Sequence, residues 1–191
     1  MTDAPRLVRP SPDALTAEQR ALYDLIVGGR RSSGPQALSI ADDEGRLVGP
    51  FNAMLLVPSL GHALQSLGVA VRYETTLSRR EREIAVLVVA AVRDSDFERY
   101  AHETIGRRAG LSDAELLALR QPTLDEFADE RERAVGHAAH ALATTGDLSD
   151  AEYAVARDLL GESVIFELTT LVGYYSLLAV QLRVFRVEAP S

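Results

Sequence analysis

The sequence predicts an all-α protein, because helix start signals recur along it, two segments are apolar on every side, and no segment alternates as a half-buried strand does. The start signals share one pattern, a Ser or Thr followed three residues later by Glu or Gln. In this capping box, each side chain accepts a hydrogen bond from the backbone N–H of the other residue. It occurs at Thr16/Gln19, Ser78/Glu81, Ser112/Glu115 and Ser149/Glu152.

These caps and the helix breakers place the elements in order along the chain. A first helix is expected over about 16–28, followed by a Gly/Ser-rich loop to about 48 and a Gly-Pro turn into a short helix that stops near Pro58. Further helices are expected over 59–75, 79–93, 95–109, 112–120, 124–144, 149–160 and 162–185. The chain thus divides into an N-terminal extension, residues 1–48, and a helical domain, residues 49–191.

Two of the expected helices are unusually apolar, over Glu83–Val92 and over most of 164–182. A helix that is apolar all round is buried all round, and a chain of 191 residues has room for one or two such helices. Two of them predict burial between subunits, and therefore an oligomer. Glu167 and Gln181 interrupt the second stretch, which favours a buried helix over a membrane span. We expect Glu167 to pair with an arginine inside the oligomer or to face a pocket, with the structural role favoured.

The composition excludes several classes of function. The net charge of −8 argues against nucleic acid and anionic membrane surfaces as partners, since both require a basic face. The absence of cysteine excludes disulfides, thiolate chemistry and Cys-ligated metal sites. The first fifteen residues contain no apolar run typical of a signal peptide, so a cytoplasmic location is expected. The charged run over 125–133 is expected to form a solvated face.

Glu98 and His102 form the main candidate for chemistry, because residues four apart on a helix lie on the same face. A carboxylate beside an imidazole can move protons near neutral pH. In the functional interpretation His102 is a general acid or base and Glu98 orients its ring. In the structural interpretation the two form a helix-surface pair that contributes about 0.3–0.5 kcal/mol.

Four more residues complete the candidate site. Glu83 is either a second carboxylate that reaches the same pocket or a first-turn glutamate favoured by the helix dipole. Tyr100 or Asn52 could donate to an oxyanion, and Phe51 and Asn52 could line the pocket mouth. The alternative for the last two is a simple helix entry. No metal or other cofactor is expected, because His137 and His140 have no further ligands in evidence.

Three stretches of the sequence resemble the carboxymuconolactone decarboxylase family, which also contains the alkylhydroperoxidase-D-like (AhpD-like) proteins. They are 80–90 (REREIAVLVVA), 97–103 (FERYAHE) and 107–112 (RRAGLS). The hydroperoxidase branch carries Glu, eleven residues, then C-x-x-C-x-x-x-H. Counting back from His102 places Ser95 and Glu98 at the cysteine positions and Glu83 on the family glutamate.

The resemblance is closer to a Cys-free branch that reads Y-E-W-Y-A-H-E at the central motif. Phe97 and Arg99 stand here in place of that Tyr and Trp. The flanking pieces Gly49–Asn52 and Leu171–Tyr175 also look like that branch. The resemblance therefore covers roughly 49–185 and keeps the Glu and His of the family without its thiols.

The resemblance implies an AhpD-like helical bundle that assembles as a homotrimer or homohexamer. It implies an enzyme that acts on a small organic acid or lactone, by decarboxylation or proton-transfer isomerisation, with His102, Glu98 and Glu83 as catalytic residues. Cysteine-dependent peroxide reduction is disfavoured, because both thiols are missing. The alternative function is a non-catalytic ligand-binding or assembly protein of the same fold.

Overall fold

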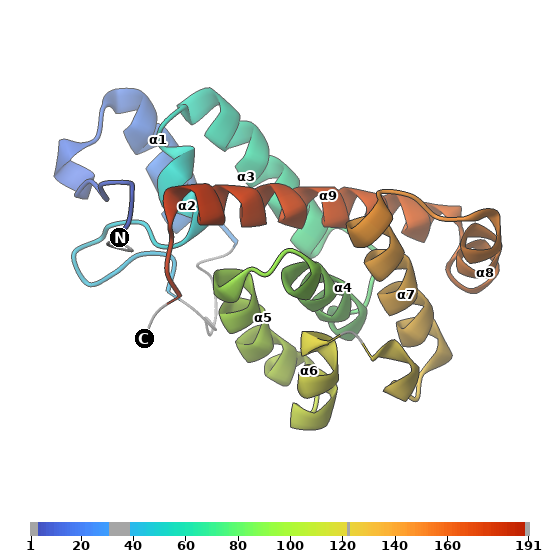
Figure 1. Ribbon diagram of the computed structural model, residues 1–191. Helices are drawn as coiled ribbons and strands as arrows, with labels where there is room; N and C mark the ends of the chain where they lie inside the picture. The colour runs from blue at the N-terminus through green and yellow to red at the C-terminus, as the bar shows by residue number, and fades with distance from the viewer. Residues whose placement is uncertain (1–3, 31–38, 122, 190–191) are drawn as a thin grey trace.

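The computed structural model describes residues 4–30, 39–121 and 123–189, and these residues form a helical fold (Figure 1). The one pairing of β type in this described part is an isolated bridge between Ala41 and Leu47. The all-α prediction is confirmed, although part of the Gly/Ser-rich loop lies outside the described residues. The elements are η1 (Pro12–Ala14), α1 (Ala17–Val27), α2 (Pro50–Met54), α3 (Pro58–Tyr73), α4 (Arg79–Val92), α5 (Asp96–Ala109), α6 (Asp113–Arg120), η2 (Leu124–Glu126), α7 (Glu130–Thr145), α8 (Asp150–Leu160) and α9 (Glu162–Phe185).

All four predicted capping boxes are closed in the structure. Thr16, Ser78, Ser112 and Ser149 each accept a hydrogen bond from the backbone N–H three residues on, and the Gln or Glu there bonds back. These caps begin α1, α4, α6 and α8. The local signal was sufficient because both partners of a capping box lie within one turn.

Two predicted boundaries were wrong. Pro58 does not stop the helix before it but is the first residue of α3, a position where the missing N–H of proline costs nothing. The helix expected over 124–144 divides into the 3-10 turn η2 and the helix α7, which begins at Glu130. Asp129 provides the start signal of α7, since its side chain accepts a hydrogen bond from the Glu132 N–H at 2.9 Å.

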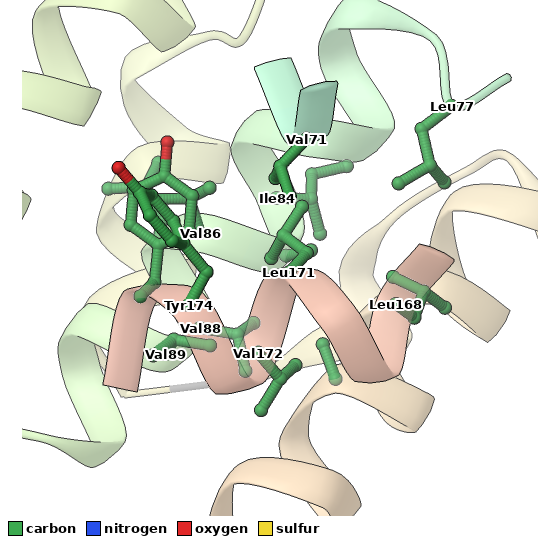
Figure 2. Packing of buried hydrophobic residues seen from close by; sticks show 14 of the residues in the cluster. Val71, Leu77, Ile84, Val86, Val88, Val89, Leu168, Leu171, Val172 and Tyr174 are labelled. Carbon is green, nitrogen blue, oxygen red and sulfur yellow. The ribbon is translucent and has the colours of Figure 1, made fainter. Parts of the chain in front are cut away.

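Helix α4 lies at the centre of the fold, with α5 and α7 beside it and α9 running across them (Figure 1). Every residue from Glu83 to Ala90 is buried, as the apolar pattern predicted. Side chains of α3, α4 and α9, with Leu77 from the turn before α4, pack together in this core (Figure 2). The labelled ones are Val71, Leu77, Ile84, Val86, Val88, Val89, Leu168, Leu171, Val172 and Tyr174. The described part of the N-terminal extension joins the same core through Leu22, Ile26, Ile40 and Leu47.

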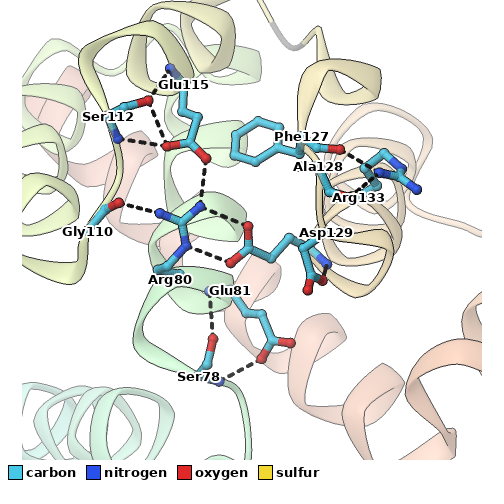
Figure 3. A network of polar contacts seen from close by, with 11 residues as sticks. Ser78, Arg80, Glu81, Gly110, Ser112, Glu115, Phe127, Ala128, Asp129 and Arg133 are labelled. Atoms are coloured by element: carbon cyan, nitrogen blue, oxygen red, sulfur yellow. Dashed lines mark hydrogen bonds and ion pairs between the residues drawn. The ribbon is translucent and has the colours of Figure 1, made fainter.

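Arg80 links three helices through the polar network shown in Figure 3. Its guanidinium contacts the Glu115 carboxylate at 2.6 Å and the Glu132 carboxylate at 2.7 and 2.9 Å. Glu132 lies in the charged run that was expected on a solvated face, yet its side chain is only 12% exposed. Arg80 therefore fastens α6 and α7 to the start of α4.

Helix α9 is long and apolar enough to cross a membrane by length and composition alone. Half of its most apolar window is buried inside the fold. Glu167, the carboxylate within it, accepts hydrogen bonds from the Thr76 N–H at 2.9 and 3.0 Å and from the Thr76 hydroxyl at 3.1 Å. Its partner in the described chain is thus the turn before α4 and not an arginine.

Candidate functional site

The packing of α4 on α5 places His102 between two carboxylates. Nδ1 of His102 lies 2.6 Å from Oε2 of Glu83, and Nε2 lies 3.4 Å from Oε2 of Glu98. Glu98 comes from the preceding turn of α5, whereas Glu83 comes from the second turn of α4. The exposed fractions are 1% for Glu83 and 4% for each of the other two residues. The structure thus brings together the three residues that were predicted from the sequence as candidate catalytic residues.

This arrangement favours the charged forms of the central pair. Burial by itself would lower the pKa of His102, but the charge and hydrogen bond of Glu83, helped by Glu98, raise that pKa above its ordinary value. Burial would likewise raise the pKa of Glu83, but the charge and hydrogen bond of His102, with Arg72 and Arg82 nearby, lower it. Each partner therefore favours the charged form of the other.

Aromatic side chains from α9 cover the imidazole. The Tyr175 ring stands edge-on to the His102 ring at 89°, with 5.1 Å between centroids. The Tyr174 ring packs in the same manner on Tyr175, at 5.3 Å and 88°. Both tyrosines are buried. The ion pair therefore lies in an apolar enclosure, where electrostatic interactions are stronger than in water.

Two arginines interact with Glu83 in addition to His102. Nε of Arg82 lies 3.8 Å from Oε1 of Glu83, the carboxylate oxygen that does not contact His102. Arg72, near the end of α3, interacts electrostatically with both Glu83 and Tyr175. Sequence reasoning missed Arg72, Arg82 and Tyr175 as neighbours of the site. Arg82 directly precedes Glu83 and Tyr175 lies in a flank of the family resemblance, but Arg72 carried no sequence signal.

The three residues expected to bind substrate have different surroundings. Tyr100 is two positions from both Glu98 and His102, which turns it to the other side of α5, and it is 40% exposed. Asn52 is buried in α2 and donates to the Val8 carbonyl at 3.2 Å. Phe51 packs against the main core. Their role in substrate binding stays a prediction that the geometry does not support.

The cluster is suited to proton transfer. Within the described residues, no group of three or more His, Cys, Asp or Glu side chains is arranged to hold a metal ion. A histidine with a raised pKa, held by one carboxylate through Nδ1, can donate or accept a proton through Nε2. Two hollows of about 580 and 530 Å³ lie elsewhere, between α7 and α8 and between the start of α5 and the end of α9.

Residues 58–146 match the profile of the carboxymuconolactone decarboxylase family. The matched stretch covers just under half of the chain and includes the central motifs that resemble that family. It contains Glu83, Glu98 and His102. No sequence among the curated proteins matches the chain.

Solved structures with the same fold extend over nearly the whole chain. An AhpD-core, uncharacterized peroxidase-related protein from Ralstonia eutropha JMP134 aligns with a TM-score of 0.78 and 15% identity, covering 98% of this chain and 93% of that one. A peroxidase-related protein from Silicibacter sp. TM1040 aligns with a TM-score of 0.75 and 16% identity, covering 100% and 94%. A cysteine-to-alanine variant of the debrominase Bmp8, in complex with 2,3,4-tribromopyrrole, aligns with a TM-score of 0.72 and 14% identity, covering 100% and 93%. These likenesses establish the fold.

Proposed function

We propose that this protein is an enzyme that uses Glu83, Glu98 and His102 to transfer protons on a small organic acid or lactone, by decarboxylation or isomerisation. The observation that supports this most is the position of His102 between two buried carboxylates at 2.6 and 3.4 Å. Because a buried charge is costly, a fold that needed only stability would gain little from this cluster. Perturbed titratable groups are instead typical of functional sites.

The roles of the three side chains follow from their distances. Decarboxylation beside a carbonyl breaks the bond to the carboxylate carbon, releases CO₂ and leaves the electron pair as an enolate. Protonated His102 then delivers its Nε2 proton to the enolate carbon, while Glu83 stabilises the imidazolium through Nδ1. In isomerisation the same nitrogen would remove a proton from one carbon and return it to another. The 3.4 Å contact with Glu98 is the longer one, so it is the contact that a substrate would replace.

Peroxide reduction through a pair of thiols is not part of this proposal. The chain contains no cysteine, and Ser95 and Glu98 occupy the positions of the two family thiols. Peroxide reduction by this route takes its two electrons from a dithiol that becomes a disulfide, and neither Ser nor Glu can form a disulfide. We therefore do not extend peroxide reduction from the peroxidase-related neighbours to this protein.

A second function is favoured by one specific observation. Both ring nitrogens of His102 face a carboxylate and the residue is only 4% exposed, which also suits a structural ion pair in a ligand-binding or assembly protein. Such a protein would bind a small molecule without converting it. Binding without turnover is thus the outcome that separates the two functions.

The experiment is a panel of small carboxylic acids and lactones with an acidic C–H bond, incubated with the protein in D₂O and followed by NMR. We expect at least one compound to lose CO₂ or to exchange that hydrogen for deuterium. His102→Gln should slow the reaction by about 10²–10⁴-fold, the usual contribution of a general acid or base. His62→Gln is the matched control, since His62 is exposed on α3. Compounds that bind without turnover, or equal rates for His102→Gln and wild type, would overturn the enzymatic proposal.

We further propose that the protein is a cytoplasmic homotrimer or homohexamer without nucleic-acid or membrane partners. An apolar stripe on α9 supports self-association, because its members lie on one helix face and stay exposed in the single chain. The stripe consists of Phe166 (73% exposed), Leu177 (40%), Val180 (58%) and Val184 (49%). The negative net charge supports the absence of nucleic-acid and anionic membrane partners.

A further inference from the structure

Arg82 has a hydrogen-bonding capacity that the described residues leave unused. Its Nε is buried and has no hydrogen-bond partner among them. The nearest carboxylate oxygen, Oε1 of Glu83, is 3.8 Å away, beyond hydrogen-bond distance. A buried donor without a partner costs free energy, and for a charged group that cost is larger than for a neutral one. Such a donor beside a candidate catalytic pair is therefore suited to a group that arrives from outside.

Arg72, near the end of α3, adds a second positive charge within electrostatic range of Glu83 and Arg82. It interacts electrostatically with Glu83, Tyr175 and Arg82, although it sits on α3 and Arg82 on α4. Burial lowers the pKa of Arg82, and the charge of Arg72 lowers it further, while Glu83 opposes both effects. Glu83 also pairs with His102, which Glu98 faces from its other ring nitrogen, so two carboxylates stand beside three cationic groups. The surroundings of Glu83 are thus short of negative charge on the side of the arginines.

We infer that Arg72 and Arg82 form the seat for a carboxylate group of the substrate, next to the Glu83 oxygen that does not contact His102. A guanidinium offers its N–H groups in a planar fork that matches the two oxygens of a carboxylate. The ligand class is a small organic acid, held at the arginines by a carboxylate that the reaction retains while its reactive carbon lies toward His102. This assignment rests on the proposed function, because it names the part of the substrate that the same site would hold.

The test compares a carboxylate with its uncharged isostere. Benzoate and benzamide are titrated by calorimetry into wild type, Arg82→Gln, Arg72→Gln and Arg82→Lys. Arg79→Gln is the matched control, since Arg79 is an exposed arginine on the same helix. We expect Arg82→Gln and Arg72→Gln each to weaken benzoate binding by about tenfold or more, and Arg82→Lys to weaken it less, because lysine keeps the charge but not the fork. Benzamide should bind weakly and equally to all five proteins.

Two results would overturn the inference: no benzoate binding to wild type, or equal benzoate affinity in Arg82→Gln and Arg79→Gln. A drop in the melting temperature of Arg82→Gln together with unchanged benzoate affinity would assign Arg82 a purely structural role, which also overturns it. His102→Gln separates this inference from the proposed function. One result would contradict only the proposed enzymatic function. It is benzoate binding that depends on the arginines and persists in His102→Gln, while wild type shows no turnover. Turnover that is lost in His102→Gln but unaffected in the arginine variants would contradict only the assignment of Arg72 and Arg82 as the carboxylate-binding residues.

Discussion

Oε2 of Glu83 and Nδ1 of His102 lie 2.6 Å apart although the two residues are 19 positions apart in the sequence. The contact joins α4 to α5 inside the apolar core, where both groups are shielded from water. It holds the imidazole by one nitrogen and turns the other nitrogen toward Glu98. Orientation by a partner on a different helix is what distinguishes this histidine from one in an ordinary i,i+4 surface pair.

The first prediction concerns stability against pH. The pKa of His102 is raised above its ordinary 6.5. The contribution of protonated His102 to the free energy of unfolding is therefore complete below about pH 6.5 and is lost as the pH rises through the folded pKa. The pKa of Glu83 is lowered below its ordinary 4.5, so its contribution is present above about pH 4.5 and is lost as the pH falls through the folded pKa. The pair therefore stabilises the fold most between these values.

Glu83→Gln tests this prediction by urea unfolding at a series of pH values. Near pH 6 the variant should lose about 3 kcal/mol of unfolding free energy, the usual cost of breaking a buried pair. The difference from wild type should shrink as the pH rises from about 6.5 toward the folded pKa, because the unfolded chain then releases a proton that folded wild type still holds. A difference that stays constant up to pH 9 would contradict the raised pKa of His102.

The second prediction separates the two carboxylates by their effect on His102. Titration of the His102 ring by NMR should show a lower pKa in both Glu83→Gln and Glu98→Gln, because each variant removes a negative charge beside the imidazole. The decrease should be larger for Glu83→Gln, whose contact is 2.6 Å against 3.4 Å. The reverse order would show that Glu98 is the dominant partner.

The third prediction concerns the backbone turn before α2. Gly49 has a φ of 64° and a ψ of −140°, and a Cβ there would overlap the Phe97 ring of α5. Gly49→Ala should therefore lower the free energy of unfolding by about 2–4 kcal/mol through backbone strain and overpacking. Thermal unfolding measures the effect.

Gly173→Ala is the matched control, because Gly173 lies in α9 with no atom within 4 Å of an added Cβ. This variant should be as stable as wild type or more stable by about 0.5–1 kcal/mol, since alanine favours a helix interior. Equal stability of the two variants would show that the turn at Gly49 tolerates a side chain.

The fourth prediction addresses self-association through the apolar stripe on α9. Val180→Asp should convert the oligomer to smaller species in multi-angle light scattering, because a charge in an apolar interface is costly to bury. Val155→Asp on α8 is the matched control, since its exposure of 56% is close to the 58% of Val180. A monomeric wild type, or an assembly that both variants leave intact, would exclude this stripe as the interface.

Much of the secondary structure was predictable because its causes are local. Ser78 and Glu81 start α4 through contacts within one turn, and the uniform apolar character of Ile84–Ala90 predicts its burial in any packing. Errors arose where another signal competed with the local pattern. The prediction of one helix over 124–144 did not recognise Asp129 as an N-cap. Asp129 lies within a run of charged residues that resembles the polar face of a continuous helix.

The sequence by itself determined the fold class, four helix starts and the shared face of Glu98 and His102, since each depends on residues within a turn or two. Only the tertiary structure decided that Glu83 reaches His102 and that Tyr175 covers the ring, because these contacts depend on how α4, α5 and α9 pack. The same holds for Arg82, whose Nε is seen to have no hydrogen-bond partner among the described residues only once the helices are packed. Long-range contacts of this kind leave no periodic pattern in the sequence from which they could be predicted.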